Sequence, residues 1–346
     1  MSRVEPTPAR RSTIKDVARA AGVSPSTVSH VLNSSRRVSQ DLAERVRSAA
    51  ATLEYQPNAM ARSLRLQTTA TLGLVLPDST NPFFAEVAQA AEETGFRHGY
   101  SVIVGNARGD LAVELVQIAA LTSRQVDGLI LIASTIKASH ANEVVGRGVP
   151  LVIVDRKMPG VEADVVLSDH FDGALQATAH LLSLQHERIG YIGGPPELIP
   201  SLDRQRGYET ALRRAGLQPD PALICQGDFQ AETGYRGARD LMRLGDPPTA
   251  IFTANDMMAI GAPRALRETH RRVPEDVSIV GFDDIFIARL LSPALTSVAQ
   301  PVRRLGEVAV ERLIARIEGR AGDRPAEVIL PTRLIPRESS AMRRGA

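Results

Sequence analysis

The sequence predicts an α/β protein: an N-terminal all-α helix-turn-helix domain with a hinge helix, followed by a two-lobed parallel α/β core. Two observations support this fold class. From Thr13 to Leu53 the pattern is helical and no strand is evident, and Pro57 then interrupts it. After residue 68, short runs rich in Val, Ile and Leu recur roughly every 20–30 residues with amphipathic segments between them, which is the βα spacing of parallel sheets. These units fall into two series, which favours two similar lobes over one large sheet.

Charge is distributed unevenly along the 346-residue chain. The formal net charge is +2, yet residues 1–67 hold 11 Lys and Arg against 5 Asp and Glu, and the remainder holds 30 against 34. A basic N-terminal part on a mildly acidic body predicts that the N-terminal part meets a polyanion. Hydrophobic residues make up 43% of the chain, which is enough for large cores.

Several classes of protein are disfavoured. The single cysteine, Cys225, cannot form an internal disulfide, which fits a reducing compartment. The chain shows neither a signal peptide nor a run of the roughly 18–20 apolar residues that span a bilayer. We therefore expect a cytoplasmic protein with no membrane partner. Because G-x-S-x-G, P-loop and H-E-x-x-H motifs are missing from the sequence, we expect no enzyme, no cofactor and no metal site. His180 and His186 are expected at the surface.

The N-terminal part contains the run IKDVARAAGVSPSTVSHVLN, which fits a helix-turn-helix. The first helix is expected over Ile14–Ala21, and Gly22 permits the tight turn. Ser24 is a good N-cap for a second helix that begins at Pro25, a favoured first helical position. A third helix over Asp41–Leu53 would close the small core. In this motif the second helix enters the major groove of DNA.

The second helix carries side chains suited to DNA contacts. Ser26 and His30 are one helical turn apart, so both can face the groove, where serine can donate or accept and histidine suits the acceptor edge of guanine. Thr27, Ser29 and Asn33 are short polar residues suited to phosphates. The alternative is that Ser26 and Thr27 simply cap the helix. The segment 58–67 is helix-forming in composition but too short to be a stable helix alone, which is typical of a switch.

These segments resemble the lactose/galactose repressor family of bacterial transcription regulators. The helix-turn-helix matches almost throughout, YQPNAMARSLR matches the family's hinge, and the resemblance covers residues 13–340. It implies a homodimer on a double-stranded DNA operator, a palindrome with a central CG step. It also implies that His30 touches a base and that Leu64, flanked by Ala61 and Arg65, wedges into the minor groove. Packing of Leu64 on the body is the alternative.

Polar side chains end several of the predicted strands. Asp155 and Arg156 end LVIVDR, Asn255 ends AIFTAN and Asp283 ends VSIVGFD. Ligands bind at the carboxyl ends of strands in α/β sheets. Carboxylates, amides and guanidinium groups can pair the hydroxyls of a sugar, and aromatic faces can pack on its C–H face. We therefore expect a small-molecule sugar effector, and the full candidate set is Asn81, Phe83, Phe84, Asp155, Arg156, Arg204, Phe229, Asn255, Asp283 and Gln300.

The same ten residues resemble the ligand set of ribose-binding members of this superfamily, both repressors and periplasmic receptors. The resemblance implies a periplasmic-binding-protein-like effector domain and an effector such as ribose or a similar pentose. Another sugar or sugar phosphate and a purine-like effector are alternatives, and Phe83 and Phe84 could instead be core residues. The predicted function is a sugar-controlled transcription regulator, most simply a repressor of sugar uptake or catabolism genes. A purine-type corepressed regulator is one alternative. A sugar-binding receptor is another, but it has no use for residues 13–66.

The predicted domain organisation follows from these segments. Residues 1–12 form a flexible leader, 13–57 the DNA-binding domain and 58–67 the hinge helix. Residues 68–340 form the effector-binding and dimerisation domain. Its N-lobe is expected over about 68–169 and 302–329, and its C-lobe over about 170–301 and 330–340.

Overall fold

The computed structural model describes residues 12–32, 36, 38–55, 68–132 and 136–343, which form two compact units divided after Thr69. The predicted hinge lies outside the described residues, together with Asn33. The roles assigned to Asn33, Ala61, Leu64 and Arg65 therefore stay predictions.

The first unit holds the three predicted helices of the helix-turn-helix domain: α1 (Ile14–Ala21), α2 (Pro25–Leu32) and α3 (Gln40–Thr52). Each helix contributes small apolar side chains to one shared core. Gly22 ends α1 in the left-handed conformation, at φ 64°, as its place in the turn requires. Observed and predicted bounds of α1 agree, and α3 begins one residue earlier than predicted.

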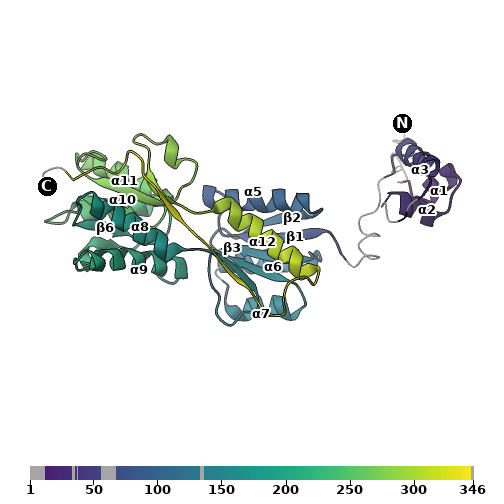
Figure 1. The fold of residues 1–346 in the computed structure, drawn as a ribbon, viewed down its shortest axis with the longest axis horizontal. Helices are drawn as coiled ribbons and strands as arrows, with labels where there is room; N and C mark the ends of the chain where they lie inside the picture. Colours follow the sequence, from purple (N-terminus) through teal and green to yellow (C-terminus); the bar gives the residue numbers. More distant parts are fainter. Residues whose placement is uncertain (1–11, 33–35, 37, 56–67, 133–135, 344–346) are drawn as a thin grey trace, which may run out of the picture. The chain divides into compact units, whose positions relative to one another are not determined.

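The second unit holds two six-stranded sheets, each with its own helices (Figure 1). The first sheet has the order β11-β5-β4-β3-β1-β2 and forms one lobe. The second has the order β12-β10-β9-β8-β6-β7 and forms the other. Neighbouring strands run parallel, apart from the antiparallel pair of β10 and β12. The predicted fold class is therefore confirmed.

Helices cover both faces of the first sheet, so its central strands are buried on two sides. This double burial explains why those strands are nearly continuous apolar runs in the sequence. The elements of this lobe are β1 (Thr71–Leu76), α5 (Pro82–Arg97), β2 (Ser101–Asn106), α6 (Leu111–Ser123), β3 (Gly128–Ile132), α7 (Ala138–Gly146), β4 (Leu151–Val154), β5 (Asp164–Ser168), α12 (Val302–Ile317) and β11 (Glu327–Leu330).

The second lobe is built around one large apolar cluster that includes the stacked rings of Tyr191 and Tyr208. Both tyrosines are fully buried, as their apolar surroundings in the sequence indicate. The elements of this lobe are α8 (His170–Ser183), β6 (Ile189–Ile192), α9 (Ile199–Arg214), η1 (Pro221–Leu223), β7 (Ile224–Cys225), α10 (Ala231–Met242), β8 (Ala250–Thr253), α11 (Asp256–Glu268), β9 (Ser278–Asp283), η2 (Ala288–Leu290), β10 (Thr296–Ala299) and β12 (Arg333–Ile335).

Within the described residues, the chain passes between the two sheets three times: from β5 to α8, from β10 to α12 and from β11 to β12. The last crossing is the yellow segment that runs from one lobe to the other in Figure 1. These short crossings place the carboxyl ends of both sheets toward each other. The strand ends of the two lobes can therefore contribute to one site.

The prediction for His186 is wrong. Its side chain is 3% exposed, and its ring nitrogens contact Thr249 Oγ1 at 2.9 Å and Ser278 Oγ at 3.1 Å. It also bonds to the carbonyl of Ala341, so it ties the C-terminal segment to the second sheet. His180 is half-buried and bonds to Ser340 in the same segment. Both histidines are therefore structural residues of the second lobe.

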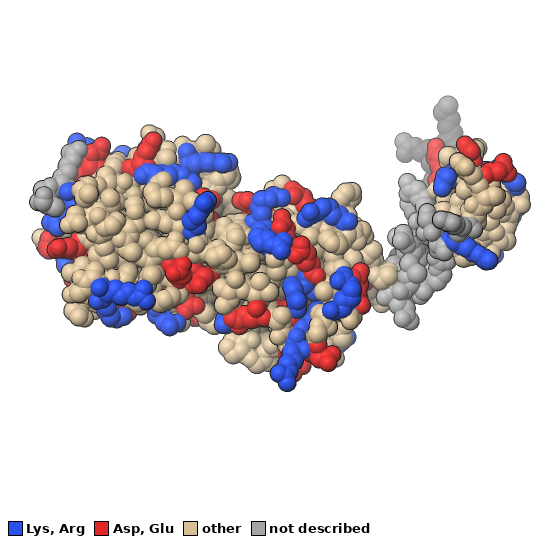
Figure 2. All heavy atoms as spheres, viewed as in Figure 1, with Lys and Arg blue, Asp and Glu red and all other residues tan. Residues whose placement is uncertain are grey.

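Charged side chains of both signs are interspersed over the visible face of the second unit (Figure 2). This mixture fits a solvated surface better than a strongly charged patch. No helix in the described part of the chain has both the length and the apolar character that crossing a membrane requires.

Candidate functional site

A cavity of about 560 Å³ lies between the two lobes of the second unit. All ten residues of the predicted effector set line it, although they come from seven separate segments of the chain. The N-lobe supplies Asn81, Phe83, Phe84, Asp155 and Arg156, the C-lobe supplies Arg204, Phe229, Asn255 and Asp283, and Gln300 stands at a crossing between the lobes.

Two asparagines fix the loops at the rim of the cavity by capping helices. Asn81 Oδ1 accepts from the backbone N–H of Phe83 at 3.0 Å at the start of α5. Asn255 Oδ1 accepts from Met258 N at 3.0 Å at the start of α11, and its Nδ2 donates to the carbonyl of Phe229. The amides therefore fix the backbone of Phe83 and Phe229 as well as lining the cavity.

Arg204 is the central cation of the cavity floor. It is 3% exposed, and its Cζ lies 4.0 Å from the ring centroid of Phe282. Its Nη1 donates to the carbonyl of Ala254, and its Nη2 lies 3.2 Å from His170 Nδ1 and 3.8 Å from Asp283 Oδ1. A guanidinium held on so many sides is preorganised, which lowers the entropy that a ligand must lose on binding.

Asp283 faces Arg204 from the end of β9, and Gln300 Nε2 donates to its Oδ1 at 2.7 Å. Burial raises the pKa of Asp283 to about 7, although Arg204 and Gln300 both act to lower it and Asp155 raises it. Behind it, burial holds the pKa of Asp256 well above its usual range. The cavity therefore contains a carboxyl group that changes charge near neutral pH.

Three residues of the predicted set hold left-handed backbone conformations: Asp155 (φ 68°), Phe229 (φ 66°) and Asp283 (φ 114°). Residues other than glycine disfavour the left-handed region of backbone conformation, and each residue held there costs about 1–3 kcal/mol. Conformations of this cost persist where a site needs a side chain aimed in one direction. Asp155 directly follows β4 and Asp283 is the last residue of β9, so two of the three lie at strand ends that line the cavity, which supports a functional role for it.

Three buried polar atoms of the cavity residues have no hydrogen-bond partner within the described part of the chain: Asp155 Oδ1, Arg204 Nε and Gln300 Oε1. Buried polar atoms in proteins are nearly always paired, so a polar ligand is the natural partner for groups of this kind. The three atoms offer one donor and two acceptors, which matches the chemistry of hydroxyl groups.

Phe83 and Phe84 belong both to the cavity wall and to the apolar core of the first lobe. Their ring centroids lie 5.1 Å apart with the planes at 76°, an edge-to-face pair. The two interpretations of these residues are therefore compatible: the rings pack in the core and also present an apolar surface to the cavity.

Sequence reasoning missed several polar residues of this region. Asp78 lies two residues after β1 and Asn106 is the last residue of β2; both line the cavity, and the strand-end rule could have found them. His170 was also missed, and it lies beneath the cavity between Asp155 and Arg204. Among the described residues, no group of three or more His, Cys, Asp or Glu side chains is placed to hold a metal ion.

In the first unit, Ser24 caps α2: its Oγ accepts from the backbone N–H of Thr27 at 3.1 Å. The hydroxyls of Ser26 and Thr27 hydrogen-bond to Ser24 Oγ at 2.7 and 2.9 Å. Ser26 is exposed, while Ser29 and His30 are half-buried on the following turn. The cap therefore belongs to Ser24, and the hydroxyl of Ser26 is accessible on the helix that the motif places in DNA.

Two family models match the chain. Residues 13–58 match the bacterial regulatory proteins of the lacI family, and residues 178–340 match a periplasmic binding protein-like domain. The HTH-type transcriptional repressor PurR of Haemophilus influenzae is 39% identical over 88% of this chain and 91% of its own length. This chain belongs to the LacI family.

Two further members of the LacI family show how far the similarity extends. The ribose operon repressor of Escherichia coli is 39% identical over 88% of this chain and 93% of its own length. A crystal structure of the lac repressor dimer bound to operator and the anti-inducer ONPF matches with a TM-score of 0.86 at 30% identity, covering 96% of this chain and all of that one. The protein is therefore a LacI-family DNA-binding transcriptional repressor, and the family consists of regulators rather than enzymes.

Proposed function

We propose that this LacI-family protein is a cytoplasmic repressor whose effector is an uncharged pentose such as ribose. Binding of this sugar releases the protein from its operator. The observation that carries this proposal is the cavity itself, in which ten side chains of the type that pairs sugar hydroxyls and covers a sugar ring converge from both lobes. Similarity to the ribose operon repressor supports the same effector class. Genes for sugar uptake or catabolism are the proposed targets.

Charge in the cavity favours an uncharged sugar over a sugar phosphate. Its lining contains five carboxylates against three guanidinium groups: Asp78, Asp155, Glu197, Asp228 and Asp283 against Arg108, Arg156 and Arg204. Arg204 is already committed to a carbonyl, an imidazole and a carboxylate. A phosphate would meet uncompensated negative charge in a partly buried space, where repulsion is poorly screened.

A purine corepressor is the second candidate, because the PurR repressor is as similar to this chain as the ribose operon repressor is. A flat purine ring binds best between aromatic faces. Phe83 and Phe84 meet edge to face, and Phe229 lies beside Arg204 at 5.7 Å. This arrangement offers C–H packing to a sugar more readily than a stacking slot to a purine.

The proposed mechanism follows from the two-lobed origin of the cavity. A sugar that bonds to Asp155 of one lobe and Asp283 of the other favours the conformation in which the two strand ends are closest. It shifts the population only to the extent that it binds this conformation more tightly than the other. In the proposed homodimer, this shift changes the spacing of the two hinge segments and weakens their hold on a palindromic operator with a central CG step.

The proposal is tested by fluorescence anisotropy of the full-length protein on palindromic DNA of about 14–20 bp, with and without the central CG. Ribose is expected to weaken operator binding by at least 10-fold, and arabinose, glucose, ribose 5-phosphate and purine bases serve as comparisons. Tighter binding in the presence of a purine base would establish the corepressed alternative. Equal affinity for both DNAs would exclude the wedge assigned to Leu64.

Replacing His30 with alanine is expected to weaken specific operator binding by about 1–3 kcal/mol, because a side chain that reads a base edge contributes about that much discrimination. Binding to random DNA should change little, since phosphate contacts dominate it. Anisotropy titrations at one fixed salt concentration measure both. Ser48→Ala, an exposed change on α3, is the matched control. An equal loss on specific and random DNA would show that His30 does not read sequence.

A further inference from the structure

Beneath the cavity, His170 connects a carboxylate of one lobe with the guanidinium of the other. Its ring is 5% exposed, with Nε2 3.2 Å from Asp155 Oδ1 and Nδ1 3.2 Å from Arg204 Nη2. Asp155 follows β4 of the first lobe, whereas Arg204 belongs to α9 of the second. His170 is therefore in contact with a residue of each lobe.

The hydrogen-bonding groups on either side of His170 indicate where its ring carries a proton. A guanidinium group has donors and no acceptor, so the contact with Arg204 requires a lone pair on His170 Nδ1. The ring proton is then on Nε2, which lies 3.2 Å from Asp155 Oδ1, within ion-pair distance but without hydrogen-bond geometry between the two atoms. A second proton would set N–H against N–H and place two cations side by side. The arrangement is consistent with one form of the ring: neutral, with the proton on Nε2.

We propose that His170 is a positioning residue of the effector site, which as a neutral imidazole holds Arg204 and Asp155 in fixed positions across the two lobes. It does not touch the effector in this role. It acts through the two residues on either side, and Arg204 continues the chain of contacts to Asp283 and Gln300. The inference rests on the proposed function in so far as the site binds a sugar.

The place of His170 in the fold explains why it can couple the lobes. It is the first residue of α8, directly after the crossing from β5, and Asp169 caps that helix by accepting from Asp172 N at 2.9 Å. The ring is thus anchored close to a pivot between the lobes. A change in the angle between the lobes alters its distance to Asp155 before it alters the interior of either lobe.

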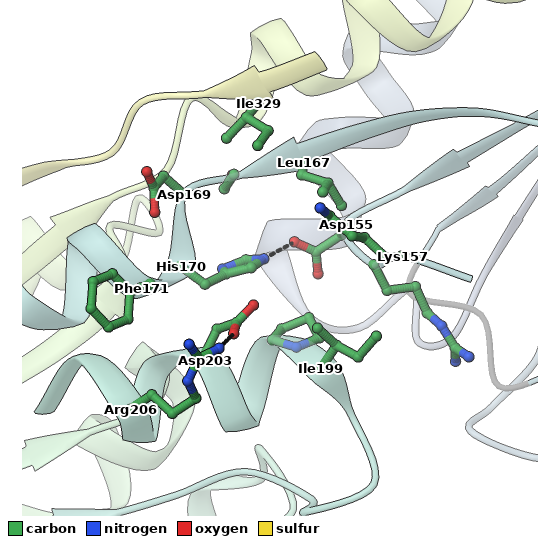
Figure 3. Close-up of a pocket in the computed structure, with 13 residues that line it drawn as sticks. Asp155, Lys157, Leu167, Asp169, His170, Phe171, Ile199, Asp203, Arg206 and Ile329 are labelled. Carbon is green, nitrogen blue, oxygen red and sulfur yellow. Dashed lines mark hydrogen bonds and ion pairs between the residues drawn. The ribbon is translucent and has the colours of Figure 1, made fainter. Parts of the chain in front are cut away.

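Figure 3 shows the contact of His170 with Asp155 beside a second cavity of about 210 Å³. Most charged groups there have partners of their own: Lys157 pairs with Glu327 at 2.6 Å, and Arg206 pairs with Asp203 at 2.9 Å. The charged groups that contact the ring are Asp155 after β4 and Arg204 on α9. Arg156, Lys157, Asp169, Asp203 and Arg206 line the second cavity beside it, and Asp283 on β9 pairs with Arg204.

The protonation state is tested without any effector. Long-range ¹H–¹⁵N correlation spectra of full-length protein labelled at histidine nitrogens are expected to show one ring in the neutral Nε2–H form at pH 7.5. That signal should be missing in His170→Asn, which assigns it. A ring protonated on Nδ1, or on both nitrogens, would overturn the proposal whatever the effector is.

The positioning role is tested with two variants and D-ribose as the probe in calorimetry. His170→Leu removes both contacts and is expected to weaken ribose binding at least 10-fold. His170→Asn keeps an acceptor toward Arg204 and should recover affinity to within about 3-fold of wild type. Wild-type affinity in the leucine variant, or equal losses in both variants, would contradict the role.

His186→Asn is the matched control, because His186 is a buried histidine of the same lobe that bonds to Thr249 and Ser278. It should lower the melting temperature and leave ribose affinity unchanged. If wild-type protein does not bind ribose, the proposed effector fails. Hydrogen exchange at Arg204 Nε then decides the positioning role, since the leucine variant should accelerate this exchange and the asparagine variant should not.

Discussion

Replacing Arg204 with leucine is expected to abolish the response to the effector and to destabilise the second unit by about 3 kcal/mol. The guanidinium is 3% exposed and is the cation opposite Asp283. Removing one partner of a buried charged pair costs about 3–5 kcal/mol, and the cost is reduced here because Asp283 can take up a proton. Arg204 lowers the pKa of Asp283, so its loss drives that pKa above about 7.

Urea unfolding and ribose calorimetry measure the two effects of the Arg204 change. Arg213→Ala is the control on the same helix, because Arg213 has 53% side-chain exposure and pairs with Glu209 at the surface. Surface pairs contribute about 0–1 kcal/mol, so this variant should unfold and bind ribose almost as wild type does. If the leucine variant binds ribose with wild-type affinity, Arg204 is not part of the ribose-binding site.

The sequence predicted the strands best where burial on both faces makes an uninterrupted apolar run. The apolar runs that predict strands over Leu151–Val154, Ile189–Ile192 and Thr296–Ala299 coincide to the residue with β4, β6 and β10. β5 was missed, because it begins at Asp164. That buried carboxylate pairs with Arg312 and Arg316 of α12 and accepts from the backbone N–H of Ala326, all of which lie about 150 residues further along the chain. Likewise, the stretch Glu327–Ile335, which is continuous in the sequence, forms two strands of different sheets, β11 and β12, because the chain crosses between the lobes there.

Recognisable strands also explain which cavity residues could be predicted from the sequence. Residues such as Asp155 and Asp283 were found because they follow recognisable strands and because they match a known ligand set. His170 follows β5, so a missed strand concealed a residue of the site. Its two contacts join α8 to both lobes. No local pattern could show that contact, the left-handed backbone of Asp283 or the raised pKa that burial gives this carboxyl group.

Sugar binding is expected to release protons near neutral pH, because a hydroxyl that donates to Asp283 stabilises the ionised carboxylate and lowers its pKa. Burial raises the pKa of Asp283 to about 7 in the protein without ligand. At pH 7, about half a proton per protomer should therefore leave on binding. Ribose affinity should rise with pH through this range. Calorimetry in two buffers with different ionisation enthalpies measures the released protons directly.

The contribution of Asp283 to the free energy of unfolding should fall as the pH rises, whereas ribose affinity should increase. An unfolded Asp has a pKa of about 3.9, so between about pH 4 and 7 the folded state holds a proton that the unfolded state has lost. The contribution of Asp283 to the free energy of unfolding is thus fully present below about pH 4 and is lost as the pH rises through about 7. Asp283→Asn should remove both pH effects, whereas Asp246→Asn, a change at an 83% exposed side chain, should preserve them. Equal binding heats in both buffers at pH 6.5 would show that Asp283 is not the titrating partner of the sugar.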